Sequence, residues 1–443
     1  MKLAGWGRYP AVEATVMGPS DPRVLAERLA RASTAIARGA GRAYGDAALN
    51  PDLTLSMLGL DRMMGFDPDT GRLTCEAGVM LADILKLFLP KGWFPPVTPG
   101  TKFDTIGGMI AADVHGKNHH VAGSFGRHVE SLDLMLADGS VVACSRTENP
   151  DLFRATVGGM GLTGIILAAT FRMIRVQTAW IKHQTLVAAN LAEVMDLFEQ
   201  SGDWTYSVAW IDCLARGDKL GRSLLYCGEH AVMGELSEPR RAVPLSVPRK
   251  RSWRMPFPLP PGLLNRWTMR LFNERYYRHG TARAGDSVVD YDTFFYPLDW
   301  IRDWNRLYRG GFTQYQCVFP KAASREGMLR LLKRISDSGQ GSFLSTLKLF
   351  GPQDPNGGFM SFPMEGTTLA LDFPVTRSVL RLFHELDAIV LDYDGRLYLA
   401  KDARAPADVI ARGYPDVGEF VRIRNESGAA TKFHSTLSRR LAL

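Results

Sequence analysis

The chain has 443 residues, of which 46% are hydrophobic, so we expect two folded lobes rather than one hydrophobic core. No run approaches the roughly twenty apolar residues of a membrane span, and the N-terminus lacks an apolar signal-peptide core, which predicts a cytoplasmic chain without an export signal. The five cysteines form no C-x-x-C pair, so neither a disulfide framework nor a zinc site is expected. The net charge of +7 is compatible with an anionic partner, but the basic residues are not interleaved along a nucleic-acid reading element, so nucleic acid is not expected.

Residues 34–175 predict short strands separated by glycine turns, with two or three helices, which is an α+β pattern. Helical spacing covers residues 21–31, where Asp21 suits the N-cap position. The other expected elements are a helix over residues 81–89 and strands over residues 34–37, 53–57, 73–76, 132–137 and 141–144. Between the last two strands, Asp138-Gly139 is a hairpin signal.

Three glycine-punctuated loops divide the first lobe: residues 38–46, 105–126 and 158–164. Glycine lets the backbone approach a ligand closely, and the HGKNHH run of the middle loop adds cationic and neutral donors. Consecutive backbone amides can cradle phosphates, as anion-binding nests do, and Arg38 and Arg42 would add charge. Three loops that converge on one ligand predict a large, anion-bearing cofactor.

The first glycine loop does not fit the dinucleotide fingerprint G-x-G-x-x-G. Gly39 and Gly41 match it, but the spacing to Gly45 is one residue too long. Residues 47–51 cannot start the long helix whose N-terminus holds a pyrophosphate in the Rossmann fold. The sequence therefore argues against that fold.

The middle loop fits neither a metal site nor a serine hydrolase site. His115 and His119 are four residues apart, which aligns two metal ligands only on a helix, and Gly116 argues against a helix here, so no metal is expected. Residues 123–126 do not form the G-x-S-x-G elbow of serine hydrolases.

From about residue 180 the sequence changes to longer strands alternating with helices, so a second lobe is expected to begin there. The expected elements of its sheet are strands over residues 310–320, 343–350 and 368–374, with helices over residues 324–338 and 377–390 packed on them.

A basic, proline-rich and mobile loop near residues 238–262 is expected to interrupt this second lobe. Basic residues beside large apolar groups can dock on an anionic membrane surface. A solvated loop without membrane contact is the alternative, because prolines prevent a regular amphipathic helix. The basic residues are Arg240, Arg241, Arg249, Lys250, Arg251 and Arg254.

Lys401 follows a short apolar-polar alternation over residues 395–400. The alternation predicts a strand that delivers the lysine to a sheet end, where partial desolvation would lower its pKa. Such a lysine could act as a base or hold a substrate oxyanion. The alternative is a surface ion pair with Asp402.

Taken together, these segments resemble the flavoprotein family of vanillyl-alcohol oxidase type, and most closely its decaprenylphosphoryl-β-D-ribose 2′-oxidase branch. The glycine loops alone identify only the wider family, whereas the HGKNHH run and the later segments make the match specific. The segments that carry the resemblance are residues 5–8, 38–46, 99–101, 105–108, 115–120, 123–126, 156–166, 304–306, 314–316, 348–352, 372–374 and 397–401.

The resemblance implies an α+β, two-lobed FAD-binding fold of PCMH type, with an antiparallel-sheet substrate domain covered by helices. Residues 1–178 would bind FAD, residues 179–395 would bind substrate, and residues 396–443 would return to the first domain. FAD would be non-covalent, because the first glycine loop lacks the histidine that tethers flavin in many relatives. The residues implied to contact FAD are Ala37, Arg38, Gly39, Ala40, Gly41, Arg42, Ala43, Tyr44, Gly45, Asp46, Ala47, Gly100, Thr105, Ile106, Gly107, Gly108, Ala112, Asp113, Val114, His115, Ile166 and Tyr398.

The implied reaction oxidises the 2′-hydroxyl of a polyprenyl-phosphoryl pentose to a ketone, with hydride passing to FAD. An NAD(P)-dependent short-chain reductase would complete an epimerisation towards the arabinose form, and the lipid substrate implies peripheral contact with the inner membrane. The residues implied in catalysis are Lys401, Tyr44, His115 and Gln316. The residues implied in substrate binding are Lys117, which would pair with the phosphate, and Gln314, Gln316, Trp210 and Lys401.

Two positions depart from the branch. Mycobacterial relatives carry cysteine where this chain has Ala370, so inhibitors that trap a cysteine should not react here. Phe295 stands where relatives carry tyrosine, which predicts altered sugar or lipid selectivity.

Two other functions remain open from the sequence. One is a soluble FAD-dependent oxidase of free sugars, alditols or aldonolactones, which would need no membrane-facing segment. The other is a non-catalytic, flavin-bound membrane or partner-binding protein, in which Lys117, Gln316 and Lys401 would have no purpose.

Overall fold

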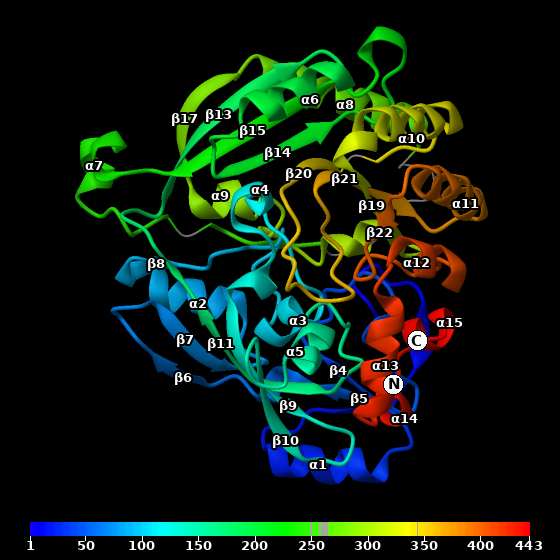
Figure 1. Ribbon diagram of the computed structural model, residues 1–443. Helices are drawn as coiled ribbons and strands as arrows, with labels where there is room; N and C mark the ends of the chain where they lie inside the picture. The colour runs from blue at the N-terminus through cyan, green and yellow to red at the C-terminus, as the bar shows by residue number, and fades with distance from the viewer. Residues whose placement is uncertain (249, 256, 258–264, 343) are drawn as a thin grey trace.

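The computed structural model describes residues 1–248, 250–255, 257, 265–342 and 344–443. They form two lobes, a lower one built on strands within residues 2–175 and an upper one built on strands within residues 180–397 (Figure 1). No helix in these ranges is both long and apolar enough to cross a membrane. The α+β, two-lobed architecture expected from the sequence is confirmed.

The lower lobe contains a five-stranded antiparallel sheet and a three-stranded parallel sheet. In spatial order the first consists of β10 (Val141–Ser145), β9 (Val129–Met135), β11 (Ile165–Arg172), β7 (Arg72–Glu76) and β6 (Met63–Phe66). The second consists of β3 (Val16–Met17), β5 (Leu53–Ser56) and β4 (Ala35–Arg38). The short ladders beside them pair β1 (Lys2–Ala4) with β2 (Ala11–Glu13), and β8 (Trp93–Phe94) with β12 (Ile174–Arg175).

The elements predicted for this lobe are present with small shifts of their ends. Helix α1 (Pro22–Arg31) begins after Asp21, whose side chain accepts a hydrogen bond from the backbone of Arg23. The predicted hairpin joins β9 to β10, and Gly139 in its turn has a φ of 86°. The remaining helices are α2 (Leu81–Phe88), α3 (Ile106–Ala111), α4 (His119–Ala122) and α5 (Pro150–Thr156).

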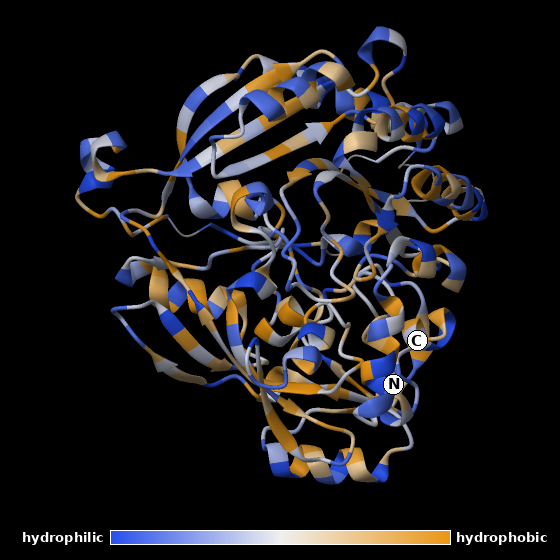
Figure 2. Cartoon of the chain, in the orientation of Figure 1, coloured by the Kyte–Doolittle hydropathy of each residue, from blue (hydrophilic) through white to orange (hydrophobic). Residues whose placement is uncertain are grey.

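The upper lobe is organised around one eight-stranded antiparallel sheet. Along the sheet, hydrophobic and hydrophilic residues alternate (Figure 2). In spatial order its strands are β17 (Gly285–Asp290), β13 (Trp180–Ala188), β15 (Ser223–His230), β14 (Tyr206–Ile211), β20 (Ser345–Phe350), β21 (Gly366–Pro374), β19 (Phe312–Pro320) and β22 (Arg396–Leu397).

The alternation along β19 separates the core from the site. Tyr315 and Cys317 are buried in the large apolar core that the sheet shares with its covering helices. Gln314 and Gln316 point to the opposite face, as the two-residue period of a strand requires. The covering helices are α6 (Leu191–Gln200), α10 (Ser324–Ser338) and α11 (Arg377–Asp392). The sequence predicted α10 with the same ends and α11 two residues shorter.

The C-terminal segment returns to the lower lobe, where its helices lie beside the N-terminal strands (Figure 1). Phe433 forms a parallel bridge with Ala35. Arg440 forms ion pairs of 2.9 Å with both Asp46 and Asp402, which ties the end of the chain to the first glycine loop. The helices of this segment are α12 (Ala407–Gly413), α13 (Val417–Glu426), α14 (Ala429–Lys432) and α15 (Thr436–Leu441).

The basic loop expected near residues 238–262 lies partly outside the described residues, which omit residues 249, 256 and 258–264. Its described cations are largely held by the protein. The guanidinium of Arg240 lies 4.1 Å from the Trp180 ring centroid, Lys250 pairs with Asp290, and Arg254 pairs with Asp303.

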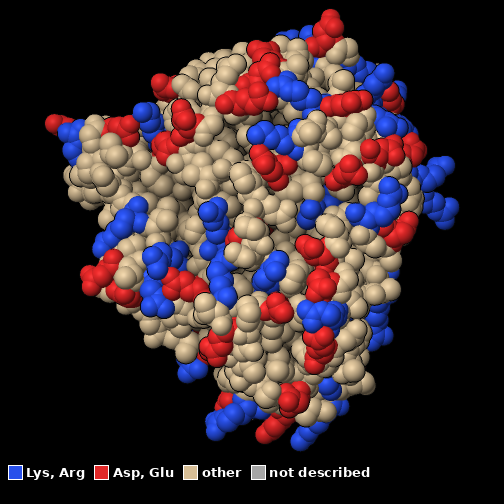
Figure 3. Space-filling model, viewed as in Figure 1, with Lys and Arg blue, Asp and Glu red and all other residues tan. Residues whose placement is uncertain are grey.

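Basic and acidic side chains are intermixed over the face shown in Figure 3. The net positive charge is therefore not gathered into one patch on that face. The upper lobe also contains the long helix α8 (Arg266–Thr281) and the short elements α7 (Glu238–Arg241), β16 (Trp253–Arg254), α9 (Tyr291–Phe295) and β18 (Ile301–Arg302).

Candidate active site

One cavity of about 780 Å³ lies where the two lobes meet. Its volume falls within the range of roughly 300–1,000 Å³ that is usual for small-molecule and cofactor sites. All three glycine loops contribute to its wall, together with β14, β15, β19, β20 and β21 of the upper sheet. The lower lobe thus supplies backbone-rich walls and the upper lobe supplies side chains.

The first glycine loop follows β4 and presents backbone amides to the cavity. Gly41 adopts a left-handed φ of 68°, which turns the chain sharply. Within the described residues, the N–H groups of Ala40, Gly41, Arg42 and Ala43 donate no hydrogen bond to the protein. The buried Nε of Arg42 also lacks a partner there. Consecutive free amides beside a guanidinium form a nest that suits a phosphate group.

Glycine is required where the first two loops pack against each other, and at Gly100 it leaves space at the cavity wall. A Cβ at Gly39 would lie 2.1 Å from Oγ1 of Thr105, so the first and second loops could not approach as they do. A Cβ at Gly100 would meet no protein atom within 4 Å and would enter open space at the cavity wall. The free amides and the glycine walls fit a bulky, phosphate-bearing cofactor such as FAD.

Most of the residues predicted to contact the cofactor line this cavity. Five do not: Arg38, Gly45, Asp46, Ile106 and Asp113 are absent from its wall. The guanidinium of Arg38, which was predicted to add charge to a phosphate site, donates to the carbonyl oxygens of Ala4 and Ala48 and so contacts the protein rather than the cavity. The predicted residues in the wall are Ala37, Gly39, Ala40, Gly41, Arg42, Ala43, Tyr44, Ala47, Gly100, Thr105, Gly107, Gly108, Ala112, Val114, His115, Ile166 and Tyr398.

The absent residues have structural partners instead. The carboxylate of Asp113 accepts hydrogen bonds from Ser124, Gly126 and Ser361. A Cβ at Gly45 would lie 1.9 Å from the carbonyl oxygen of Asp402, so this glycine permits close packing of the C-terminal segment. These positions hold the loops in place behind the wall.

Lys401 lies in the cavity, with its ammonium 3.7 Å from the ring centroid of Tyr44. Burial lowers the pKa of Lys401 to about 8, although the nearby carboxylates of Asp104 and Asp372 favour its charged form. The expected strand before it is only two residues long, since β22 ends at Leu397 and a turn carries Lys401. A lysine in this state can exchange a proton near neutral pH.

The alternative that Lys401 merely pairs with Asp402 is wrong. The carboxylate of Asp402 instead binds Arg440 and accepts hydrogen bonds from the backbone of Arg404 and Ala405. The side chain of Asp402 therefore serves the fold of the C-terminal segment, and Lys401 remains available to a ligand.

His115 and Gln316 meet across the two lobes, with 2.9 Å between Nε2 of His115 and Nε2 of Gln316. Burial is the main reason that the pKa of His115 lies well below its ordinary value, and the charge of Lys348 lowers it further. Nδ1 of His115 is buried and has no partner among the described residues. Tyr398 lies beside this ring and donates its hydroxyl to the carbonyl oxygen of Ala112.

Three lysines line the cavity. The ammonium of Lys117 donates to the carbonyl oxygen of Phe294, and burial lowers the pKa of Lys117 to about 7. Burial also lowers the pKa of Lys348 to about 8, with a further contribution from Lys401. Because each lysine disfavours a second positive charge nearby, together they favour an anionic ligand.

Lys348 was not among the side chains singled out from the sequence, although its segment was. The pattern Leu347-Lys348-Leu349 in a predicted strand was the available signal, because alternation places the lysine on the face opposite Leu347. Leu347 is fully buried in the core and Lys348 lines the cavity.

Two acidic side chains were also missed. Burial raises the pKa of Asp372 to about 7, and Gln314 donates to one of its carboxylate oxygens at 2.6 Å. Asp372 is the only charged residue of β21, which was a usable signal. Burial likewise raises the pKa of Asp104 to about 6, but this residue precedes Thr105 in an irregular loop and gave no signal.

The remaining predicted positions also lie at the cavity. Trp210 on β14 packs its ring 4.7 Å from that of Tyr276, and both belong to the wall. Ala370 and Phe295, where the sequence departs from its relatives, are wall residues as well.

The histidine pair is not arranged as a metal site. His119 begins α4, a one-turn helix where Gly116 argued against one, and His115 precedes that helix. His119 Nδ1 accepts a hydrogen bond from the backbone of Gly351 at 3.3 Å. Within the part of the chain that the structure describes, no three His, Cys, Asp or Glu side chains form a group that could hold a metal.

Comparison with known proteins adds independent information. Residues 16–145 match the family described as FAD binding domain. The chain is 40% identical over 453 aligned positions to decaprenylphosphoryl-beta-D-ribose oxidase of Mycolicibacterium smegmatis, covering 100% of this chain and 97% of that protein. It is 34% identical to an uncharacterized protein of Streptomyces coelicolor, covering 82% of this chain and all of that one.

A more distant similarity is confined to part of the chain. Mouse L-gulonolactone oxidase is 31% identical over 161 residues, which is 36% of this chain and 35% of that enzyme.

Proposed function

The chain belongs to the FAD-dependent oxidoreductase family that includes decaprenylphosphoryl-beta-D-ribose oxidase, and we propose that it oxidises the 2′-hydroxyl of a polyprenyl-phosphoryl pentose of ribose type to the 2′-ketone. The observation that carries this proposal is the group of Lys117, Lys348 and Lys401 around one cavity. A phosphorylated sugar has the charge that this group favours, whereas a neutral sugar does not.

The cofactor is FAD, and we propose that it is held without a covalent bond. Among the first-loop residues that line the cavity, Arg42 and Ala43 follow Gly41, and none is a histidine that could be linked to the flavin. The free amides of that loop would bind the pyrophosphate, with Arg42 beside them. When bound, FAD supplies the two-electron hydride acceptor.

Lys401 is the proposed base for the substrate hydroxyl. As the carbinol carbon gives up its hydride, the hydroxyl proton passes to the neutral amine of Lys401. A pKa of about 8 keeps part of this amine unprotonated near neutral pH, and the carboxylates of Asp104 and Asp372 stabilise the ammonium that forms. Tyr44 holds the amine over its ring and limits its motion.

His115 and Gln316 are proposed to position the sugar. The amide of Gln316 is fixed by His115 and by Thr368, whose Oγ1 accepts from it at 3.4 Å. The neutral imidazole adds no charge next to the carbinol carbon, so it can orient the substrate without taking its proton. Gln314 and Trp210 would contact the pentose from the upper sheet.

Lys117 and Lys348 are proposed to bind the phosphate. The carbonyl oxygen and ring of Phe294 hold the ammonium of Lys117. A phosphate between the two lysines would raise the pKa of each and keep both charged. The polyprenyl chain would then extend along the aromatic wall that includes Trp210 and Tyr276.

The 2′-ketone would be the substrate of a separate NAD(P)-dependent short-chain reductase, and reduction from the opposite side would complete an epimerisation towards the arabinose form. Because the lipid substrate resides in a bilayer, we further propose peripheral association with the inner membrane.

The part of L-gulonolactone oxidase that matches this chain keeps open an oxidase of free sugars or aldonolactones. The purified holoenzyme should be mixed without oxygen with short-chain polyprenyl-phosphoryl ribose, the corresponding arabinose compound, free ribose and L-gulonolactone. Loss of flavin absorbance with the phosphorylated ribose, together with a product two hydrogens lighter, is the expected result. Bleaching by the free sugar or lactone alone would refute the proposal, and no bleaching by any of them would favour a non-catalytic flavin-bound protein.

A further inference from the structure

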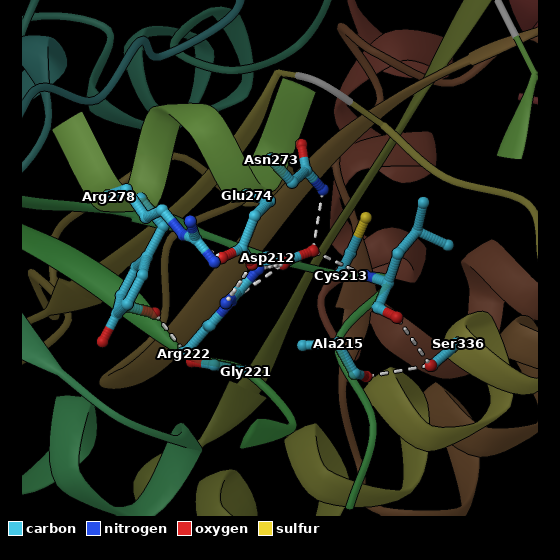
Figure 4. A network of polar contacts seen from close by, with 12 residues as sticks. Asp212, Cys213, Ala215, Gly221, Arg222, Asn273, Glu274, Arg278 and Ser336 are labelled. Atoms are coloured by element: carbon cyan, nitrogen blue, oxygen red, sulfur yellow. Dashed lines mark hydrogen bonds and ion pairs between the residues drawn. The ribbon is translucent and has the colours of Figure 1, made fainter. Parts of the chain in front are cut away.

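Helix α8 (Arg266–Thr281) is fixed firmly to one end of the upper sheet. The side chain of Asn273 donates a hydrogen bond of 2.7 Å to Oδ1 of Asp212, the residue that follows β14 of the sheet. Arg222 links the same two parts, with ion pairs of 2.8 Å to Asp212 and to Glu274 of the helix (Figure 4). A Cβ at Gly280 would lie 2.1 Å from Leu224, so the helix approaches the sheet closely.

These contacts determine which side of α8 faces outward. Met269, Asn273 and Gly280 lie on the side that packs on the sheet. Trp267 and Leu271 fall on the opposite side, with 63% and 66% of their surfaces exposed. A tryptophan and a leucine exposed to this extent one turn apart form an apolar face that a soluble helix does not need.

The same helix carries positive charge that the protein does not neutralise. Residues 265–284 contain five arginines and one glutamate. The glutamate, Glu274, is already paired with Arg222 and Arg278. Among the described residues, Arg266, Arg270 and Arg275 have no acidic partner. The guanidinium of Arg266 instead lies 4.6 Å from the ring centroid of Trp267.

The helix also reaches the cavity. Its residue Tyr276 belongs to the cavity wall, and its hydroxyl lies 3.0 Å from that of Tyr226 on the sheet. Trp210, on the same wall, packs against it. The sheet-facing side of α8 therefore borders the cavity.

We propose that the face formed by Arg266, Trp267, Arg270 and Leu271, here called the α8 face, docks on an anionic lipid bilayer. An exposed Arg266 and a half-buried Arg270 next to an exposed tryptophan and leucine match the headgroup and acyl boundary of such a surface. The docked helix would bring the cavity mouth to the membrane, where a lipid-linked phosphate sugar is found. This inference rests on the proposed function for its substrate, but not for the lipid contact itself.

Charge complementarity favours a bilayer over a protein partner. Beside its apolar residues the α8 face carries two arginines without an acidic partner among the described residues, and an anionic leaflet offers negative charge across a flat surface. The sequence placed membrane contact on the loop near residues 238–262, but Lys250 and Arg254 in that loop are used in ion pairs. Arg241 and Arg251 of that loop are exposed and have no acidic partner among the described residues, whereas α8 carries three arginines without such a partner in one helix.

The test is sedimentation of the full-length holoenzyme with vesicles of phosphatidylcholine alone and of equimolar phosphatidylcholine and phosphatidylglycerol. We expect binding to the anionic vesicles only. The double variant Arg266→Gln/Arg270→Gln should lower the partition coefficient by about tenfold or more, because it removes two positive charges near the anionic surface. Trp267→Ser/Leu271→Ser should lower it by a similar factor, because it removes the apolar groups that enter the interface. FAD content and melting temperature of each variant show that it is folded.

Matched controls lie on helices other than α8, namely α10, α1 and α12. Leu329→Ser removes an exposed leucine of α10, and Arg31→Gln/Arg412→Gln removes two exposed arginines without an ion pair among the described residues. Both controls should bind anionic vesicles like the unchanged protein. Equal binding by the α8 variants, or binding to neutral vesicles alone, would overturn the proposal and leave an acidic protein partner for the α8 face.

The same variants separate this inference from the proposed function. Turnover of a short-chain, water-soluble polyprenyl-phosphoryl ribose should stay within about twofold, since no residue of the α8 face lines the cavity. Turnover of a long-chain substrate in anionic vesicles should fall with binding. If the unchanged protein binds vesicles but oxidises neither substrate, the proposed function fails and the docking surface stands.

Discussion

His115 of the lower lobe and Gln316 of the upper lobe are joined by a hydrogen bond of 2.9 Å between their Nε2 atoms. The amide nitrogen of glutamine can only donate, so Nε2 of His115 must accept and the ring proton must reside on Nδ1. The lowered pKa of His115 agrees with this neutral form. The bond fixes both the tautomer of the histidine and the distance between the lobes at the cavity.

Replacing Gln316 by Leu should destabilise the protein. The change leaves a buried imidazole nitrogen without its donor, which costs about 1–3 kcal/mol. Urea unfolding followed by circular dichroism would measure the free energy of unfolding, and Gln200→Leu, at the exposed end of α6, serves as the control. Equal stability of the Gln316 variant and the control would show that the bond between the lobes contributes nothing measurable.

Replacing Lys401 by Met should abolish most of the reaction without loss of cofactor. Removal of a positioned general base typically lowers a rate about 10²–10⁴-fold. The rate of flavin bleaching by substrate in stopped flow measures this, with FAD content and melting temperature unchanged. Lys219→Met, at an exposed position, is the control. A bleaching rate close to that of the unchanged protein would remove Lys401 from the mechanism.

The pH dependence of bleaching should follow Lys401. Its pKa of about 8 means that raising the pH through 8 converts the ammonium to the neutral amine, which is the form that accepts a proton. The bleaching rate should therefore rise to a plateau above pH 8, and the Lys401→Met variant should lose this rise. A rate that falls through the same range would instead assign Lys401 to holding an oxyanion in its charged form.

Replacing Gly100 by Val should weaken FAD binding while the fold persists. A side chain at this position meets no protein atom and would occupy space at the cavity wall. We expect the dissociation constant of FAD to rise at least about tenfold, which corresponds to about 1.4 kcal/mol. Gly65→Val on β6, where a Cβ is also unopposed but lies away from the cavity, is the control. Identical FAD affinity in both variants would exclude Gly100 from the cofactor site.

Replacing Ala370 by Cys should make the cavity reactive towards thiol-trapping electrophiles. The five native cysteines are all buried, and burial raises the pKa of Cys75 to about 12 and of Cys144 and Cys213 to about 11, so their thiolates are scarce. Ala370 is a wall residue of the cavity. Intact-protein mass spectrometry should detect one adduct on the variant and none on the unchanged protein. An adduct on the unchanged protein would show that another thiol is accessible.

The sequence was informative where local patterns determine structure. The glycine loops, the hairpin at Asp138-Gly139 and helix α10 depend on backbone conformation and on apolar spacing along one segment, and all three are present. The strand before Lys401 was overestimated, because after Leu397 the chain turns back to pack Tyr398 and Ala400 against the lower lobe. Alternation alone could not indicate that turn.

Two of the side chains missed at the site, Lys348 and Asp372, reach it through pairing between distant strands. In the sheet register, Ala370 of β21 lies opposite Gln316 of β19 on one side and Thr346 of β20 on the other. Lys348 therefore approaches Lys401 only because β20, β21 and β19 are neighbours, and no segment by itself contains that information. The position of Arg38 likewise depends on a distant segment, because its guanidinium donates to the carbonyl oxygen of Ala4.

The most direct test of the account is anaerobic mixing of the purified yellow holoenzyme with short-chain polyprenyl-phosphoryl ribose, followed by flavin absorbance and by the mass of the sugar product. The account predicts that the flavin bleaches fully, that one ketone forms per flavin, and that the Lys401→Met protein stays yellow. A colourless polypeptide that takes up no FAD, or a holoenzyme that remains yellow with this substrate, would contradict it.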